Sequence, residues 1–287
     1  MEKRESMVQK TAIVTGASSG FGLLITVELA KRGFLVYATM RNLEKSHHVT
    51  EAVPSADVLS RIQFEPLDVT NHDSIEQFKQ FIKTLKRVDV LVNNAGYALG
   101  GFSEEITIDE YRAQFETNVF GTMAVTQTVL PTMRKQKSGT IINMSSISGL
   151  IGFPGISPYV ASKHALEGYS ESLRLELKPY GINVAIVQPG SFKTNIWTTG
   201  KQISERSLQE TSPYYNYMEK IEAEMKAGEE NLGEPQDVAE LVASLAEKRK
   251  IKYLRYPVGK GVRNMMRLKK LVPWPTWESK FLKRLKI

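Results

Sequence analysis

The chain has 287 residues, of which 41% are hydrophobic and 24% are charged, a balance typical of a soluble globular protein with a substantial core. The absence of cysteine excludes disulfides, thiolate metal ligands and cysteine nucleophiles, and we predict no metal site. No apolar run is long enough to span a bilayer, and residues 1–10 lack the apolar segment of a signal peptide, so a cytoplasmic location is expected.

The net charge of +7 is unevenly distributed along the chain. From Glu247 to Ile287 there are 14 Lys or Arg against 2 Glu, a net +12, which leaves −5 for residues 1–246. The main body is therefore mildly acidic, and the C-terminal tail is strongly basic.

Short β-branched runs alternate with helical patterns. Thr11–Thr15 ends in glycines and has the composition of a buried parallel strand. A helix is predicted from about Leu23 to Arg32, where Gly33 ends it, and Phe34–Met40 is predicted as the second strand. Further strands are predicted at 62–68, 88–92, 140–143, 183–187 and 252–258, and helices at 75–85, 109–137, 161–177 and 235–248. This order predicts an α/β protein with one doubly wound parallel sheet and helices on both faces.

Two interruptions are expected within the helical stretch 109–137. The first is a break near Gly121, and the second is a kink or break at Pro131, because proline has no amide donor and clashes with the preceding turn. The interval 191–233 has weak periodicity and several aromatic residues, and no regular element is assigned to it.

The glycine-rich turn after the first strand predicts a dinucleotide site. Gly16, Gly20 and Gly22 let the backbone approach a pyrophosphate, and the N-terminus of the following helix supplies N–H donors. Arg41 follows Met40 at the end of the second strand, where an NAD enzyme usually has an acidic residue for the ribose 2′-hydroxyl. A guanidinium suits a 2′-phosphate, so NADP(H) is favoured over NAD(H); the alternative is a solvated surface arginine.

Two further turns lie at the carboxyl ends of predicted strands, the edge at which open α/β sheets bind ligands. Asp68 and Val69 are placed to contact the adenine ring, although Asp68 alone is more typical of a helix cap. Asn93–Gly96 forms a tight turn that either lines the cofactor or is purely structural.

Tyr159 and Lys163 are four residues apart, so in a helix both side chains share one face. The cation would favour the phenolate and lower the tyrosine pKa toward working pH, which makes proton transfer practical. Ser146, upstream in a small-residue loop, would direct a hydroxyl at the same substrate oxygen. The alternative for so common a spacing is a surface helix with an ordinary tyrosine and lysine.

Taken in order, these motifs resemble those of the short-chain dehydrogenase/reductase family. The matching segments are TGASSGFG at 15–22, LDV at 67–69, NNAG at 93–96, TNVFG at 117–121, YVASK at 159–163 and QPGSFKT at 188–194. The resemblance covers about residues 8–260 and implies a Rossmann-like catalytic domain, with residues 261–287 as a C-terminal extension.

The resemblance implies a catalytic tetrad. Tyr159 would be the general acid for ketone reduction or the base for alcohol oxidation, and Lys163 would lower its pKa and hold the nicotinamide ribose. Ser146 would hydrogen-bond the substrate oxygen as charge develops on it. Asn118 would anchor, through its backbone carbonyl, a water that connects Lys163 to solvent.

The cofactor contacts that the motifs and the resemblance imply follow the carboxyl ends of several strands and include the start of the helix at 161–177. They are Gly16, Ser18, Ser19, Gly20, Phe21, Gly22, Arg41, Asp68, Val69, Asn94, Ala95, Gly96, Tyr159, Lys163, Pro189, Gly190 and Thr194.

Within the family, the segment 97–197 and the basic extension are most similar to hydroxysteroid and retinol dehydrogenases, which implies a lipophilic alcohol or ketone. The substrate residues expected on this basis are Ser146, Tyr159, Phe153, Phe192 and Trp197, below a lid formed by 191–233. The alternative for the aromatic residues is core or interface packing. The alternatives for function are the same chemistry on a small polar sugar or acyl substrate, and an NADP(H)-binding protein with little turnover.

The resemblance also implies a homodimer or homotetramer built on helices at about 109–137 and 157–179. The tail interleaves Lys and Arg with Trp and Leu, so it is either a solvated or lid-forming extension or a weak peripheral membrane contact. No nucleic-acid partner is expected, because no recognised module accompanies the basic tail.

Overall fold

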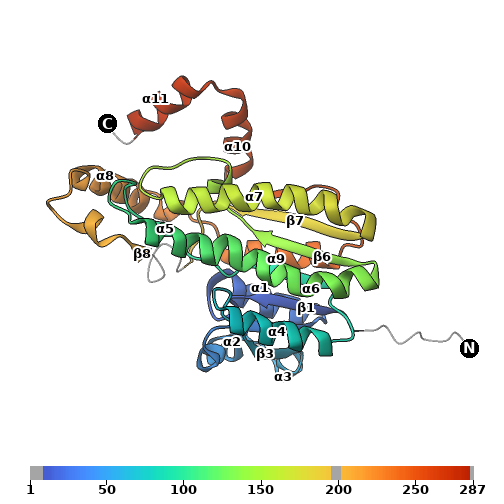
Figure 1. Ribbon diagram of the computed structural model, residues 1–287. Helices are drawn as coiled ribbons and strands as arrows, with labels where there is room; N and C mark the ends of the chain where they lie inside the picture. The colour runs from blue at the N-terminus through green and yellow to red at the C-terminus, as the bar shows by residue number, and fades with distance from the viewer. Residues whose placement is uncertain (1–8, 195–201, 285–287) are drawn as a thin grey trace, which may run out of the picture.

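A seven-stranded sheet organises the protein (Figure 1), for which a computed structural model describes residues 9–194 and 202–284. Every neighbouring pair of strands is parallel. In spatial order the strands are β3 (Ile62–Pro66), β2 (Leu35–Met40), β1 (Thr11–Thr15), β4 (Val90–Asn93), β6 (Gly139–Met144), β7 (Ile182–Pro189) and β9 (Arg255–Val258).

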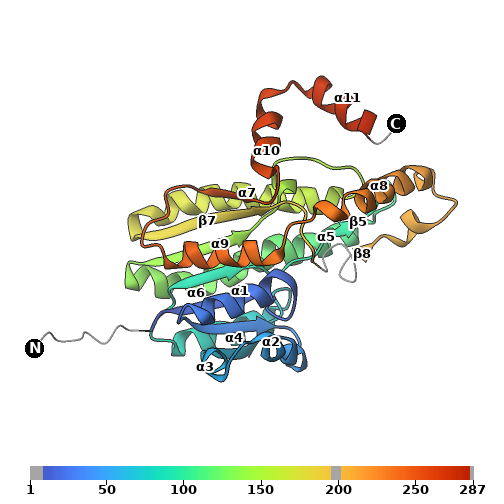
Figure 2. The same cartoon turned by 180° about the vertical axis from the view of Figure 1, so that it is seen from behind.

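Helices cover both faces of the sheet, which confirms the predicted doubly wound α/β fold. One face carries α4 (His72–Thr84), α5 (Ile108–Phe115), α6 (Thr122–Gln136) and α7 (Ser157–Leu177), in front in Figure 1. The other carries α1 (Gly20–Lys31) and α9 (Pro235–Glu247), in front in Figure 2. Two short helices, α2 (Ser46–Ala52) and α3 (Ala56–Leu59), lie between β2 and β3 in the chain.

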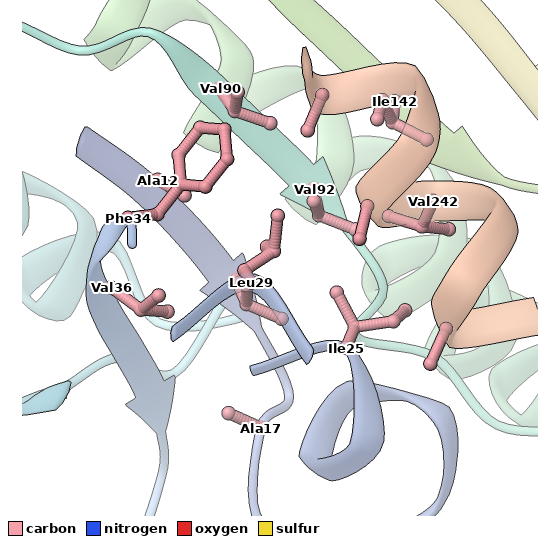
Figure 3. Packing of buried hydrophobic residues seen from close by; sticks show 14 of the residues in the cluster. Ala12, Ala17, Ile25, Leu29, Phe34, Val36, Val90, Val92, Ile142 and Val242 are labelled. Carbon is pink, nitrogen blue, oxygen red and sulfur yellow. The ribbon is translucent and has the colours of Figure 1, made fainter. Parts of the chain in front are cut away.

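Each face of the sheet has its own apolar core, as a parallel sheet buried on both sides requires. Figure 3 shows the first of these cores, in which Ile25 and Leu29 of α1 and Val242 of α9 lie over Val92 and Ile142 of the sheet. These side chains are fully buried. The core therefore holds α1 firmly against the end of β1, where the glycine turn lies.

The predicted breaks near Gly121 and at Pro131 are wrong, and a kink at Pro131 stays a prediction. Between α5 and α6 the chain forms a π-helical turn at Glu116–Gly121, so the helix widens there and does not break. Such turns are often found at functional sites. α6 runs through Pro131 and ends at Lys137 in the left-handed conformation.

The described part of the segment 191–233, for which no regular element was predicted, contains a strand and a helix. Gln202–Ile203 (β8) pairs with Leu99–Gly100 (β5) in a separate small sheet, and Tyr215–Ala227 forms α8. The C-terminal tail forms α10 (Val262–Leu271) and α11 (Trp274–Arg284), which rise away from the sheet on the β7 and β9 side in both views (Figures 1 and 2). A domain boundary near residue 260 stays a prediction.

Among the described residues, no helix is both long and apolar enough to cross a membrane.

Candidate active site

The predicted glycine turn lies at the point where the strand order reverses, between the carboxyl ends of β1 and β4. In parallel sheets this crevice is where nucleotides bind. Gly16 and Gly20 have φ angles of +65° and +54°, which side chains disfavour. A Cβ on Gly22 would lie 2.2 Å from the Gly16 carbonyl oxygen, so the close approach of α1 to the turn requires glycine.

The N-terminus of α1 is suited to an anion. Its N-cap residue, Ser19, makes no side-chain hydrogen bond to the first turn, so that side chain leaves the first N–H groups uncapped. A Cβ on Gly20 would meet no atom within 4 Å, which shows open space beside this terminus. The geometry fits a pyrophosphate held by backbone donors.

The Asn93–Gly96 turn is bonded directly to the glycine turn. The Asn94 amide donates to the carbonyls of Thr15 and Gly16, at 2.9 and 3.1 Å. The Thr15 hydroxyl oxygen accepts from the N–H groups of Asn94 and Ala95, at 2.9 and 3.0 Å. These contacts show a structural role for Asn94 and for Thr15, which the motif analysis did not single out. A direct cofactor contact from Asn94 stays a prediction.

Arg41 is exposed directly after β2, and among the described residues it has no ion-pair partner. Asp68 does not cap the following helix. Its carboxylate accepts from the N–H and hydroxyl of Thr70, at 2.9 and 2.7 Å, and the cap of α4 is Asn71. Val69 is buried against Gly121, where an added Cβ would come within 2.8 Å of it.

The tyrosine and lysine occupy the first turns of α7 on its inner face. Tyr159 is 4% exposed and Lys163 is 6% exposed, so the surface-helix alternative is wrong. The Lys163 ammonium donates to the Met144 carbonyl at 2.8 Å, which joins α7 to the end of β6. Ser146 caps the short turn Ile147–Gly149 and hydrogen-bonds Tyr159 through its hydroxyl.

The predicted lowering of the tyrosine pKa is wrong for the protein chain itself. Burial raises the pKa of Tyr159 to about 12, against an opposing effect of the Ser146 hydrogen bond. Burial also lowers the pKa of Lys163 from 10.5 to about 8, and Glu167 opposes that shift. Desolvation is the largest cause of both pKa shifts. The spacing of residues in the sequence does not show how deeply a side chain is buried, so it could not predict these shifts.

Asn118 lies within the π-helical turn and is 1% exposed. Its amide donates to the Tyr97 carbonyl and to the Ser162 hydroxyl, both at 3.1 Å, and its oxygen accepts from the Tyr97 N–H at 3.1 Å. Ser162 in turn donates to the Tyr159 carbonyl at 2.8 Å. The side chain therefore joins the π-helical turn to the start of α7, and the water-anchoring role of its carbonyl stays a prediction.

The third predicted cofactor segment begins at the end of β7. The Gly190 N–H donates to the Val258 carbonyl at 3.0 Å, and an added Cβ would lie 2.4 Å from Val262. The Thr194 hydroxyl is buried and has no hydrogen-bond partner among the described residues. Such an atom calls for a partner, and the carboxamide of a nicotinamide would supply one.

The predicted aromatic substrate residues have different packing partners. Phe153 packs against Phe281 of α11, with ring centroids 5.8 Å apart. Phe192 is buried in the core against Phe21, at 5.6 Å, so its printed contacts are packing contacts and a substrate contact stays a prediction. Trp197 lies outside the described residues.

A cavity of about 430 Å³ lies between the small sheet and α5. It is lined by apolar Tyr97, Leu99 and Ile203 and by polar groups that include Glu110 and Arg206. The tetrad residues do not line this cavity. Tyr97 does line it, and because the Tyr97 N–H donates to the Asn118 side chain, the cavity lies next to one member of the tetrad.

Comparison with known proteins gives the same family as the geometry. Residues 10–204 match the family model described as short chain dehydrogenase. The chain belongs to the short-chain dehydrogenase/reductase family. It is 50% identical to the uncharacterized oxidoreductase YusZ of Bacillus subtilis over 279 residues, 97% of this chain and 99% of the relative.

Two further relatives have assigned activities. The chain is 42% identical to 3-ketodihydrosphingosine reductase of Bacteroides thetaiotaomicron, with 71% of each chain covered. It is 37% identical to human retinol dehydrogenase 8, over 70% of this chain and 64% of the relative. The predicted similarity to retinol dehydrogenases is confirmed.

Solved structures agree. A short-chain dehydrogenase from Streptomyces avermitilis has a TM-score of 0.80 and 33% identity, with 98% of each chain covered. ElxO with NADP bound has a TM-score of 0.72 and 28% identity, with 90% of this chain and 100% of that chain covered. The protein is thus an oxidoreductase with a Rossmann-like fold whose structural neighbours include NADP-bound members.

The buried lysine predicts how stability depends on pH. Between about pH 8 and pH 10.5 the unfolded chain binds the Lys163 proton and the folded chain does not, so the free energy of unfolding rises with pH across this window. Relative to Lys163→Met, the wild type should gain about 3 kcal/mol over this range. Urea titrations of both proteins at pH 7.5 and 10 measure it, and the tyrosine contribution cancels in the difference. A constant difference would contradict the desolvation of Lys163.

Proposed function

We propose that the protein is an NADPH-dependent reductase of a carbonyl group on a long-chain, lipid-like substrate. The observation that supports it best is the buried set of Ser146, Tyr159 and Lys163 at the carboxyl edge of the sheet. Similarity to 3-ketodihydrosphingosine reductase supports the substrate class, since 3-ketodihydrosphingosine carries one ketone on a long alkyl chain.

The chain's own residues account for the proton. With a pKa of about 12, Tyr159 is protonated at neutral pH and acts as the general acid toward the carbonyl oxygen. Ser146 donates a hydrogen bond to that oxygen as negative charge develops on it. The charged form of Lys163 stabilises the phenolate that remains. A bound nicotinamide supplies the hydride.

The proposed roles make a sharp test possible. Tyr159→Phe should lower kcat/KM for carbonyl reduction by about 10³-fold or more, because no other group supplies the proton. NADPH affinity should stay within about threefold, measured by fluorescence titration.

The substrate class is tested with 3-keto lipids of increasing chain length, with small sugars and acyl ketones in parallel. kcat/KM should rise with chain length, because each buried CH₂ contributes about 0.8 kcal/mol. Equal activity on short and long ketones would overturn the lipid assignment. Tight NADPH binding without turnover of any carbonyl would overturn the proposed enzyme.

NADP(H) is proposed over NAD(H) because Arg41 is exposed at the end of β2 with no ion-pair partner among the described residues. Arg41→Asp should lower the preference for NADPH over NADH, as a ratio of kcat/KM values, by about tenfold or more. Arg134→Asp, the same charge change on an exposed arginine of α6, is the matched control and should leave the ratio unchanged. An unchanged ratio in both variants would make Arg41 an ordinary surface residue.

The tail is proposed to border the substrate entrance. Val262 and Met266 of α10 pack on Ile151 of the loop that follows Ser146, and Phe281 of α11 meets Phe153 of the same loop. Arg284 forms an ion pair with Glu224 of α8. These contacts join the tail to the loop that follows Ser146 and to α8, and they support the lid alternative.

The outer side of the tail supports a peripheral membrane contact. Four of its apolar side chains are exposed and are called the apolar ridge below: Met265, Leu268, Leu271 and Trp274. Arg263, Arg267 and Lys270 lie beside this ridge on α10. Apolar residues flanked by cations are suited to an anionic lipid surface, from which a lipid-like substrate would enter.

Leu271→Glu tests the membrane contact, since Leu271 is 81% exposed. The change should lower co-sedimentation with phosphatidylglycerol vesicles severalfold, because it places a carboxylate against the lipid headgroups. Leu208→Glu is the control, at 55% exposure and outside both the tail and the predicted interface helices. Equal losses in both variants, or a change in oligomeric state confined to Leu271→Glu, would contradict a lipid partner.

A further inference from the structure

A carboxylate that the proposed chemistry does not use lies beneath the reaction centre. Glu167 is 3% exposed in α7, four residues after Lys163 and eight after Tyr159. This spacing places all three side chains on the inner face of the helix. A buried carboxylate is costly unless it is paired, so its surroundings decide what it does.

Both oxygens of Glu167 are bonded. Oε2 accepts from the Arg255 guanidinium of β9 at 2.8 Å, and Oε1 accepts from the Gln188 amide of β7 at 2.9 Å. Gln188 directly precedes Pro189 and Gly190, the start of the predicted nicotinamide segment. Arg255 also pairs with the exposed Glu171, one turn further along α7.

Glu167 also packs against the turn that Ser146 begins. A Cβ added to Gly149 would lie 2.9 Å from the Glu167 Cγ and 3.1 Å from its Oε1. The carboxylate therefore touches the serine turn and the end of β7, and it lies one helical turn from the lysine.

We propose that Glu167 is a positioning residue of the reaction, which keeps the Lys163 ammonium charged and fixes the Ser146 turn and the end of β7 around it. The kinetic consequence rests on the proposed reductase function. The effect on the charge of Lys163 does not.

The charges around Lys163 support this role. Glu167 raises the pKa of Lys163 and opposes the effect of burial. Tyr159, on the same helix, is neutral up to about pH 12, and Arg255 on β9 offsets part of the Glu167 charge. From β6 the lysine meets the uncharged Met144 carbonyl. Glu171 pairs with the same arginine but does not contribute to the Lys163 shift.

The alternative is that Glu167 merely joins α7 to β9 through an ion pair. Glu171→Gln separates the two explanations, because it also removes a carboxylate from Arg255 and leaves Glu167 in place. Glu167→Gln keeps the shape of the side chain, removes its charge and replaces one of its two accepting oxygens with an NH2 donor.

The titration of Lys163 is read directly by NMR of protein labelled with ¹³C at the lysine ε carbon, with the signal assigned by its loss in Lys163→Met. Glu167→Gln should lower the midpoint by about one pH unit or more, because a nearby opposite charge no longer favours the ammonium. Glu171→Gln should keep the wild-type midpoint. Arg255→Gln, which removes the competing cation, should raise it and provides a second variant of opposite sign.

The pH dependence of carbonyl reduction completes the test. In Glu167→Gln the fall in kcat/KM at high pH should move by the same amount as the NMR midpoint. An unchanged Lys163 midpoint in Glu167→Gln would overturn the inference, even if the enzyme is active. A shifted midpoint in a protein that reduces no carbonyl would overturn the proposed function and leave the role of Glu167 in the lysine charge intact.

Discussion

The site depends on the burial of one ammonium group. Lys163 hydrogen-bonds the Met144 carbonyl at 2.8 Å, and this bond holds the first turns of α7 against the end of β6. Burial shifts the pKa values of the two neighbouring side chains in opposite directions: it raises the pKa of Tyr159 and lowers the pKa of Lys163. The tyrosine is therefore a firmly protonated acid at neutral pH, while the lysine lies near its titration midpoint and responds to any charge placed close to it.

Parallel strand order brings the remaining parts together. Because the carboxyl ends of β1, β4, β6 and β7 meet at one edge, four distant segments converge there without long connections. The bonds from Asn94 to Thr15 and Gly16 then hold two of these ends at a fixed separation. These bonds fix the glycine turn beside the N-terminus of α1, where a Cβ on Gly20 would meet no atom within 4 Å.

Local patterns predicted the strands of the large sheet and the long helices that cover it, because alternation and helical periodicity are properties of neighbouring residues, whereas the tetrad was implied by the resemblance to the family. The direction of the Tyr159 pKa was not predictable in this way, since desolvation depends on what packs over the helix. Pro131 inside α6 and the π-helical turn at Glu116–Gly121 also depend on tertiary packing that overrides local propensity. Phe192 shows the same limit, because its place in the core against Phe21 follows from contacts distant in the chain.

The position of Glu167 lets it favour the charged form of Lys163 without forming a direct ion pair with the ammonium. A direct ion pair would keep Lys163 charged, but it would also hold the ammonium away from the reaction centre. Here the carboxylate takes its hydrogen bonds from Arg255 and Gln188, so it acts on the lysine through its field alone. The ammonium stays bonded to the Met144 carbonyl and directed toward the tyrosine side of the helix. Arg255 in turn offsets the cost of burying Glu167, which explains why a strand at the edge of the sheet matters to chemistry at its centre.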